Sequence, residues 1–108
     1  MSTSEIFGKN LKKIRKDLKL NQEKFAELLD IQTRSLSDIE NGKYLPTPSN
    51  IDKICNKLGV SVKNLFDEEE KNIDSKKNEI IRLINLKLKI LSENQLEIIY
   101  NIVNNAFK

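Results

Sequence analysis

Residues 21–43, NQEKFAELLDIQTRSLSDIENGK, constrain the fold of this chain more than any other stretch. Apolar residues recur there at spacings of three and four, which predicts two short helices joined by a tight turn. Asn41-Gly42 ends the second helix, because glycine readily adopts the left-handed conformation that helix C-termini commonly need. The side of the pair that we expect to be buried consists of Phe25, Ala26, Leu29, Leu36 and Ile39.

The opposite side of the second helix carries hydrogen-bonding side chains, namely Thr33, Arg34, Ser37 and Asp38. A short helix that is packed from behind and polar in front fits the major groove of DNA. Arg34 can donate two hydrogen bonds to guanine O6 and N7, and the methyl group of Thr33 suits thymine. Asp38 has two interpretations: it accepts from cytosine N4, or it pairs with Arg34 and orients it, which we favour.

These residues belong to a longer ordered set: Arg15, Leu20-Asn21-Gln22, Phe25-Ala26, Leu29, Ile39-Glu40-Asn41-Gly42-Lys43, Pro46, Ile54, Leu58-Gly59-Val60-Ser61 and Leu65-Phe66. The set resembles the helix-turn-helix domains of the phage Cro and cI repressor superfamily, without a gap from about Phe7 to Phe66. The resemblance implies an all-α, five-helix DNA-binding domain over residues 1–66, with a recognition helix at about 33–41.

The resemblance also implies roles for individual side chains. Base contacts fall to Gln32, Thr33, Arg34, Ser37 and Asp38. Phosphate contacts fall to Lys9, Lys12, Gln22, Asn41, Lys43 and Tyr44, although a solvated surface is the alternative for most lysines of the first helix. Arg15 and Glu40 form a structural ion pair in this family, which ties the first helix to the end of the recognition helix.

Two positions depart from the family pattern. Asp30 stands in the turn where glycine is usual, and aspartate visits the left-handed region at a modest cost. Gln32 stands where Ser or Thr usually caps the recognition helix. Thr33 is an alternative cap, which would shift the helix start by one residue and remove Thr33 from base reading.

The remaining helices of the first 66 residues follow from apolar stripes and caps. The first helix is predicted from about Ser4 to Lys19. Asn21 is predicted to cap the second helix, Thr47 the fourth and Ser61 the fifth. The lone Cys55 is expected to be a buried small residue, and a chain without an internal disulfide fits a reducing cytoplasm.

Composition narrows the class of function. Residues 1–66 carry a net charge of +4, residues 67–78 carry −2 and residues 79–108 carry +1, so positive charge is concentrated where phosphates would bind. The sequence has no histidine, no cluster of metal ligands and no glycine-rich phosphate loop, so we expect no enzyme, no metal and no cofactor. It also has no apolar run of membrane-spanning length, and its N-terminus, MSTSEIF, lacks the apolar stretch expected of a signal peptide.

The last part of the chain is rich in large apolar side chains. Residues 67–78 read as a charged linker, and residues 79–108 as a helical hairpin with helices at 79–91 and 93–107, the second capped by Ser92. One hairpin cannot bury all of this apolar surface, so we expect multimerisation rather than the alternative of packing back on the first domain. The residues assigned to it are Ile80, Ile81, Ile84, Leu88, Leu91, Leu96, Ile99, Ile102, Val103 and Phe107.

The sequence therefore predicts a DNA-binding transcriptional regulator, a repressor in the cytoplasm of a bacterium or a phage-infected cell. We expect it to bind an inverted repeat of double-stranded DNA as a homodimer, or as a tetramer. Regulators of the SinR type have a similar layout, which implies a small protein antagonist as a further partner. The alternative is an antitoxin or anti-regulator whose hairpin binds a partner protein.

Overall fold

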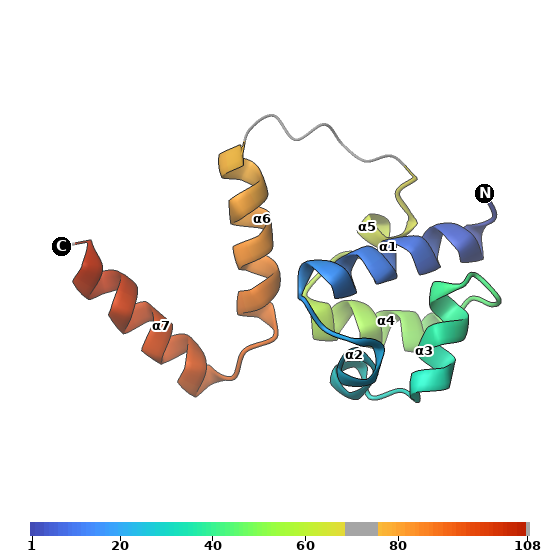
Figure 1. The fold of residues 1–108 in the computed structure, drawn as a ribbon, viewed down its shortest axis with the longest axis horizontal. Helices are drawn as coiled ribbons and strands as arrows, with labels where there is room; N and C mark the ends of the chain where they lie inside the picture. Colours follow the sequence, from blue (N-terminus) through green and yellow to red (C-terminus); the bar gives the residue numbers. More distant parts are fainter. Residues whose placement is uncertain (69–75, 108) are drawn as a thin grey trace.

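A computed structural model of the chain describes residues 1–68 and 76–107, which form seven helices and no strand. The helices are α1 (Thr3–Asp17), α2 (Gln22–Leu29), α3 (Thr33–Glu40), α4 (Pro48–Leu58), α5 (Val62–Phe66), α6 (Lys76–Lys89) and α7 (Glu93–Ala106) (Figure 1). The all-α prediction is confirmed. Residues 69–75 of the predicted linker lie outside the described residues, and residues 76–78 form the first turn of α6.

Side-chain caps set the starts of most helices. Ser2 caps α1 in a capping box with Glu5, so this helix starts one residue before the predicted Ser4. It also ends at Asp17, earlier than predicted, because Lys19 adopts a left-handed conformation with φ of 59°. Asn21, Thr47, Ser61 and Ser92 cap α2, α4, α5 and α7 as predicted, each accepting a hydrogen bond from a backbone N–H.

The turn between α2 and α3 follows the expectation for Asp30, which has φ of 59° and ψ of 46°. Gln32 occupies the cap position of α3 without a side-chain hydrogen bond to the helix. Thr33 is the first residue of α3, so the alternative in which Thr33 caps the helix is wrong. Thr33 therefore keeps its place on the polar side of α3.

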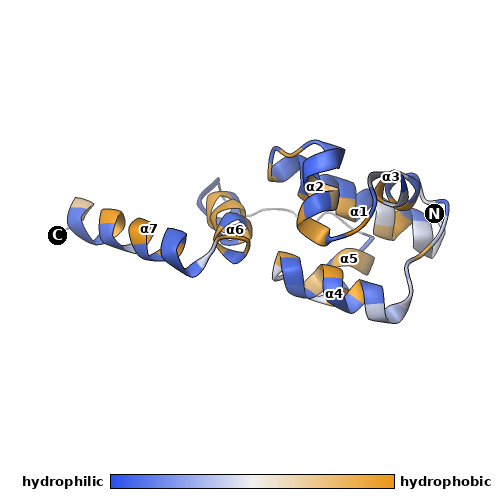
Figure 2. Ribbon diagram, turned by 90° about the horizontal axis from the view of Figure 1, so that it is seen from below, coloured by the Kyte–Doolittle hydropathy of each residue, from blue (hydrophilic) through white to orange (hydrophobic). Residues whose placement is uncertain are grey.

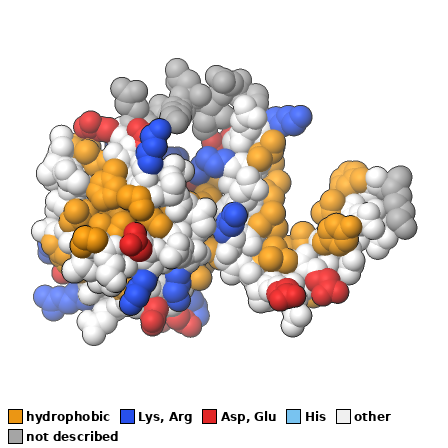
Figure 3. Space-filling view, turned by 180° about the vertical axis from the view of Figure 1, so that it is seen from behind, with side chains coloured by type: hydrophobic (Ala, Val, Ile, Leu, Met, Phe, Trp, Pro, Cys, Tyr) orange, Lys and Arg blue, Asp and Glu red, His pale blue; other side chains and the backbone are white. Residues whose placement is uncertain are grey.

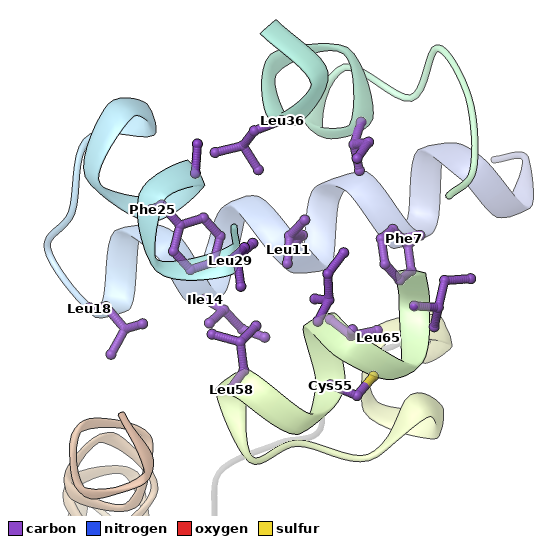
Figure 4. Close-up of a cluster of buried hydrophobic side chains, with 14 of the residues drawn as sticks. Phe7, Leu11, Ile14, Leu18, Phe25, Leu29, Leu36, Cys55, Leu58 and Leu65 are labelled. Atoms are coloured by element: carbon purple, nitrogen blue, oxygen red, sulfur yellow. The ribbon is translucent and has the colours of Figure 1, made fainter. Parts of the chain in front are cut away.

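The core lies between α1, α2, α3, α4 and α5 (Figure 4). Phe7 and Leu11 from α1, Phe25 from α2, Leu36 from α3 and Leu65 from α5 are completely buried, and Cys55 is buried as predicted. The ring of Phe7 also packs against that of Phe66, with ring centroids 5.2 Å apart. This core holds the inner side of α3 and leaves its outer side free.

Helix α6 packs on α4 and on the end of α1 instead of pairing with α7. Leu86 is buried in the core, and Leu83 and Ile90 pack against it. The Arg82 guanidinium donates to Asp17 Oδ2 at 2.8 Å, and Lys87 Nζ donates to the Leu18 carbonyl at 2.9 Å. For α6, the alternative in which the C-terminal part packs back on the first domain is therefore the correct one.

Helix α7 extends away from α6 and from the first five helices (Figures 1 and 2). None of its residues is buried. The two C-terminal helices follow one another through a short turn, but they diverge and do not form the closed seam expected of a hairpin. The apolar side of α7 is therefore left open.

Candidate nucleic-acid interface

A close approach of α1 to α3 sets the position of the helix that carries the candidate base-reading residues. Gly8 is buried in α1, and a Cβ added there would overlap the carbonyl oxygen of Ile39 and lie 3.0 Å from that of Glu40. No side chain fits between the two backbones at this point. Sequence reasoning missed Gly8; the signal was a glycine inside a strongly amphipathic helix, where glycine is otherwise unfavourable.

The end of α3 is fixed by a buried ion pair. Arg15 donates to Glu40 through Nε at 2.8 Å and through a second guanidinium nitrogen at 3.1 Å, and it also donates to the Leu20 carbonyl at 3.0 Å. The Glu40 side chain is 1% exposed. Gln22 Nε2 donates to the same carboxylate at 3.1 Å. One carboxylate therefore joins α3 to α1 and to the first turn of α2.

The side chains expected to contact bases lie together on the outer side of α3. Gln32, Thr33 and Arg34 are exposed, and Ser37 and Asp38 are half-buried. This side of α3 is accessible from solvent, as the approach of a duplex requires.

Asp38 forms an ion pair with Lys43 and not with Arg34, the partner that we favoured from the sequence. The Lys43 ammonium lies 3.4 Å from the Asp38 carboxylate, and Arg34 takes part in no ion pair among the residues that the structure describes. The interpretation in which Asp38 orients Arg34 is therefore wrong. The carboxylate instead joins α3 to the loop that follows it, and Arg34 keeps its full reach.

The candidate phosphate-contacting residues divide into two groups. Lys9, Lys12 and Asn41 line one shallow hollow of about 300 Å³, together with Glu5 and Glu40. The hydrogen bonds of Ser2 to Glu5, from the backbone first and the side chain second, lower the pKa of this carboxyl, so it stays charged beside the two lysines.

The second group lies at the start of α2 and after α3. Gln22 uses one amide hydrogen for Glu40, which leaves the other for an outside acceptor. Lys43 and Tyr44 are exposed in the loop after α3. Sequence analysis did not foresee that Gln22 and Lys43 are also bound within the protein.

The residues assigned to multimerisation differ in exposure. Ile80, Ile81 and Ile84 on α6 and Ile102, Val103 and Phe107 at the end of the chain are exposed. Leu88, Leu91 and Ile99 are half-buried, and Leu96 is 36% exposed. Figure 3 shows a hydrophobic stripe along α6 and hydrophobic patches on α7. The buried side of α6 uses Leu83, Leu86 and Ile90 instead, which sequence analysis did not select.

Other kinds of site find no support in the described part of the chain. Residues 1–68 and 76–107 contain no group of three His, Cys, Asp or Glu side chains placed to hold a metal ion. No helix in these two ranges is long and apolar enough to cross a membrane.

Comparison with known proteins adds independent information. A family model described as a helix-turn-helix domain matches residues 8–71. The control protein C.MunI of Mycoplasma sp is 42% identical over 66 residues, which cover 60% of this chain and 89% of that protein. The immunity repressor protein of Bacillus phage phi105 is 36% identical over 62 residues, 57% of this chain and 43% of that protein.

Two further matches are an antitoxin and a solved structure. Antitoxin PezA of Streptococcus pneumoniae is 38% identical over 65 residues, so this match spans 60% of the chain and 41% of the antitoxin. The crystal structure of a transcriptional regulator from Listeria innocua covers 92% of this chain and 90% of its own, with a TM-score of 0.52 and 22% identity. The latter likeness concerns the fold alone.

Proposed function

This chain belongs to the helix-turn-helix family, among regulators of the Cro and cI type, and we propose that it represses transcription as a dimer bound to an inverted repeat of DNA. The observation that carries the proposal is the two-sided character of α3. Its inner side is fixed by the core and by the Arg15–Glu40 pair, and its outer side is polar and open. A rigid helix with free donors and acceptors can enter a major groove without losing entropy of its own backbone.

We assign base reading to the outer side of α3. Arg34 is exposed and free of an ion pair in the described structure, so its guanidinium can donate to guanine O6 and N7. Thr33, Ser37 and Gln32 supply shorter polar groups around it. Asp38 is held by Lys43, which screens a carboxylate that phosphates would otherwise repel.

We assign phosphate binding to the edges of the same surface. Lys9, Lys12 and Asn41 surround one hollow, and Gln22 has a free amide hydrogen at the N-terminus of α2, where helix N–H groups also favour an anion. Lys43 and Tyr44 provide a cation and a hydroxyl in the next loop. Each of these groups contacts a phosphate in the proposed complex and thereby fixes the register of α3 in the groove.

Dimerisation is assigned to the open apolar surface of α6 and α7. Ile98, Tyr100, Ile102 and Phe107 are each 59% exposed or more, which is unfavourable for a helix in water. A second copy that covers this surface removes that cost and places two recognition helices roughly 34 Å apart, one turn of the duplex. Such a regulator acts where bacterial DNA lies, in the cytoplasm.

A salt titration of DNA affinity tests the proposal. The three candidate lysines per protomer, Lys9, Lys12 and Lys43, give six phosphate contacts in a dimer, for which log affinity should fall with log salt with a slope of about −5. The assay uses an inverted repeat selected from random oligonucleotides and a scrambled duplex of equal length. The repressor requires both the steep slope and a strong preference for the selected repeat. Weak binding that is equal on both duplexes contradicts it.

A second candidate function is that of an antitoxin or anti-regulator whose C-terminal helices bind another protein. The observation that favours it is the similarity to a protein named as an antitoxin, together with the open side of α7. In that case the purified chain stays monomeric, and its α7 surface becomes protected only when a protein partner is added. A stable homodimer of the isolated chain argues against it.

A further inference from the structure

The packing of α6 on the first domain forms a cavity that is open to solvent and shares Met1 and Lys9 with the shallow hollow of Lys12 and Asn41. It has a volume of about 590 Å³ and lies between α1, the turn from α4 to α5, and α6. This volume falls in the range of about 300–1,000 Å³ that small-molecule sites usually have. None of the residues that we assign to base reading lines it.

Part of the cavity wall is apolar, and this part comes from three separate segments of the chain. Ile14 lines it from α1, Leu58 from the end of α4, and Leu86 from α6. All three are buried core residues, so this wall is rigid. An apolar group of a ligand would therefore contact both the first domain and α6.

Cations outnumber carboxylates around the cavity. Lys9, Lys13, Arg82 and Lys89 line it, against Asp67 and Glu68. Arg82 is already held by Asp17 at 2.8 Å and by Glu79, and Lys13 lies 3.9 Å from Asp17. Lys89 has no ion-pair partner among the described residues, and its side chain lies over Gly59 at the end of α4.

Lys89 and the two carboxylates lie at different places along the cavity. Asp67 follows α5, where its carbonyl accepts a hydrogen bond from Asn10, and Glu68 follows it in the sequence. Lys89 is instead at the C-terminal end of α6, beside the last turn of α4. Within the described structure, Lys89 therefore offers an unpaired cation next to the apolar wall of Leu58 and Leu86.

We propose that this cavity binds an amphipathic organic anion, with its carboxylate at Lys89 and its hydrocarbon part against Ile14, Leu58 and Leu86. Since α6 forms one wall, such a ligand binds only when α6 is packed on the first domain and stabilises that arrangement. It thereby fixes the position from which α7 extends. The site shares Lys9 with the proposed phosphate contacts, and its test is made without DNA.

Calorimetric titration of the full chain with decanoate, without DNA, tests this site. Decylammonium and decanol serve as probes with the same hydrocarbon part and a different head group. Saturable binding of one decanoate per chain, at least fivefold tighter than either of the other probes, is the expected result. No saturable binding of decanoate, or tighter binding of decylammonium, overturns the proposal.

Matched variants locate the site. Lys89→Glu should weaken decanoate binding by about fivefold or more, as expected for loss of an exposed charge contact and its reversal. Lys57→Glu is the control, because Lys57 also lies in the last turn of its helix and is exposed, but does not line the cavity. Wild-type affinity in Lys89→Glu, or an equal loss in both variants, contradicts the assignment.

A second pair of variants tests the apolar part. Asn85 is exposed on α6 and lines the cavity, so Asn85→Phe should fill it and abolish binding, whereas Asn56→Phe on α4, outside the cavity, should not. Both side chains are on the surface, so both variants should fold. Unchanged decanoate binding in Asn85→Phe overturns the proposal even if the lysine variants behave as expected.

Discussion

Replacing Gly8 by alanine sets two effects of opposite sign against each other. In an ordinary helix the change stabilises, by about 1 kcal/mol, because alanine is the better helix former. In this structure the new methyl group would overlap the backbone carbonyl of Ile39 and crowd that of Glu40. Backbone atoms cannot turn aside as a flexible side chain can, so α1 and α3 must separate.

The second effect should win. Overpacking a well-packed core costs about 1–3 kcal/mol, and a backbone obstacle places this site at the upper end. Subtracting the gain in helix propensity leaves a net destabilisation of about 2 kcal/mol, since about 3 kcal/mol opposes about 1 kcal/mol. For a domain of this size, that corresponds to a fall in melting temperature of roughly 8–16 °C.

Urea and thermal unfolding followed by circular dichroism at 222 nm measure both quantities. Lys16→Ala is the control, because Lys16 is exposed on the same helix and its replacement should change stability by no more than about 0.5 kcal/mol. If Gly8→Ala raises the melting temperature, the close approach of α1 and α3 is refuted. In that case α1 would not support the recognition helix α3 through a backbone contact at Gly8.

Three further predictions concern single side chains. Gln22→Ala should weaken DNA binding about tenfold and equally on all operator variants, since it removes one phosphate hydrogen bond per protomer; a changed base preference in binding assays contradicts this. Ile102→Asp should be a monomer by light scattering and should bind DNA more weakly, because it places a charge on the exposed apolar side of α7. The neighbouring Asn101→Asp should remain a dimer. A dimer in both variants refutes the assignment of dimerisation to α7. Cys55 should react with Ellman's reagent at pH 8 only as fast as the protein unfolds, because its thiol is buried out of reach of the reagent. Burial first, and Asp52 second, also raise the pKa of this thiol, which lowers its thiolate fraction. Reaction at the rate of a free thiol argues against a buried site.

The features that were predictable from the sequence depend on neighbours in the chain. A cap such as Asn21 or Thr47 bonds a backbone N–H three residues further on, so its effect does not depend on the rest of the fold. The left-handed turn at Asp30 is local in the same sense. The pairing of Arg15 with Glu40 could be predicted only from the resemblance to the Cro and cI repressors, because the spacing of the two residues in the sequence does not indicate a contact.

The features that were not predictable depend on contacts between distant segments. An apolar surplus in residues 79–91 shows that α6 must bury a surface, but not whether another copy or the first domain covers it. The structure decides through Leu86 in the core and through the bond of Arg82 to Asp17, 65 residues away in the chain. Likewise, the ion-pair partner of Asp38 depends on how the loop after α3 folds back. This loop brings the Lys43 ammonium close to the Asp38 carboxylate, so that Lys43 and not Arg34 is its partner.

The most direct test of the account compares Arg34→Ala with the wild-type chain on a selected operator and on all its single-base variants. The account predicts that the variant loses discrimination at one base position in each half-site, by about 1–3 kcal/mol, and keeps its preferences elsewhere. An equal loss of affinity on every operator variant would contradict it, because Arg34 would then contact only the backbone of the DNA.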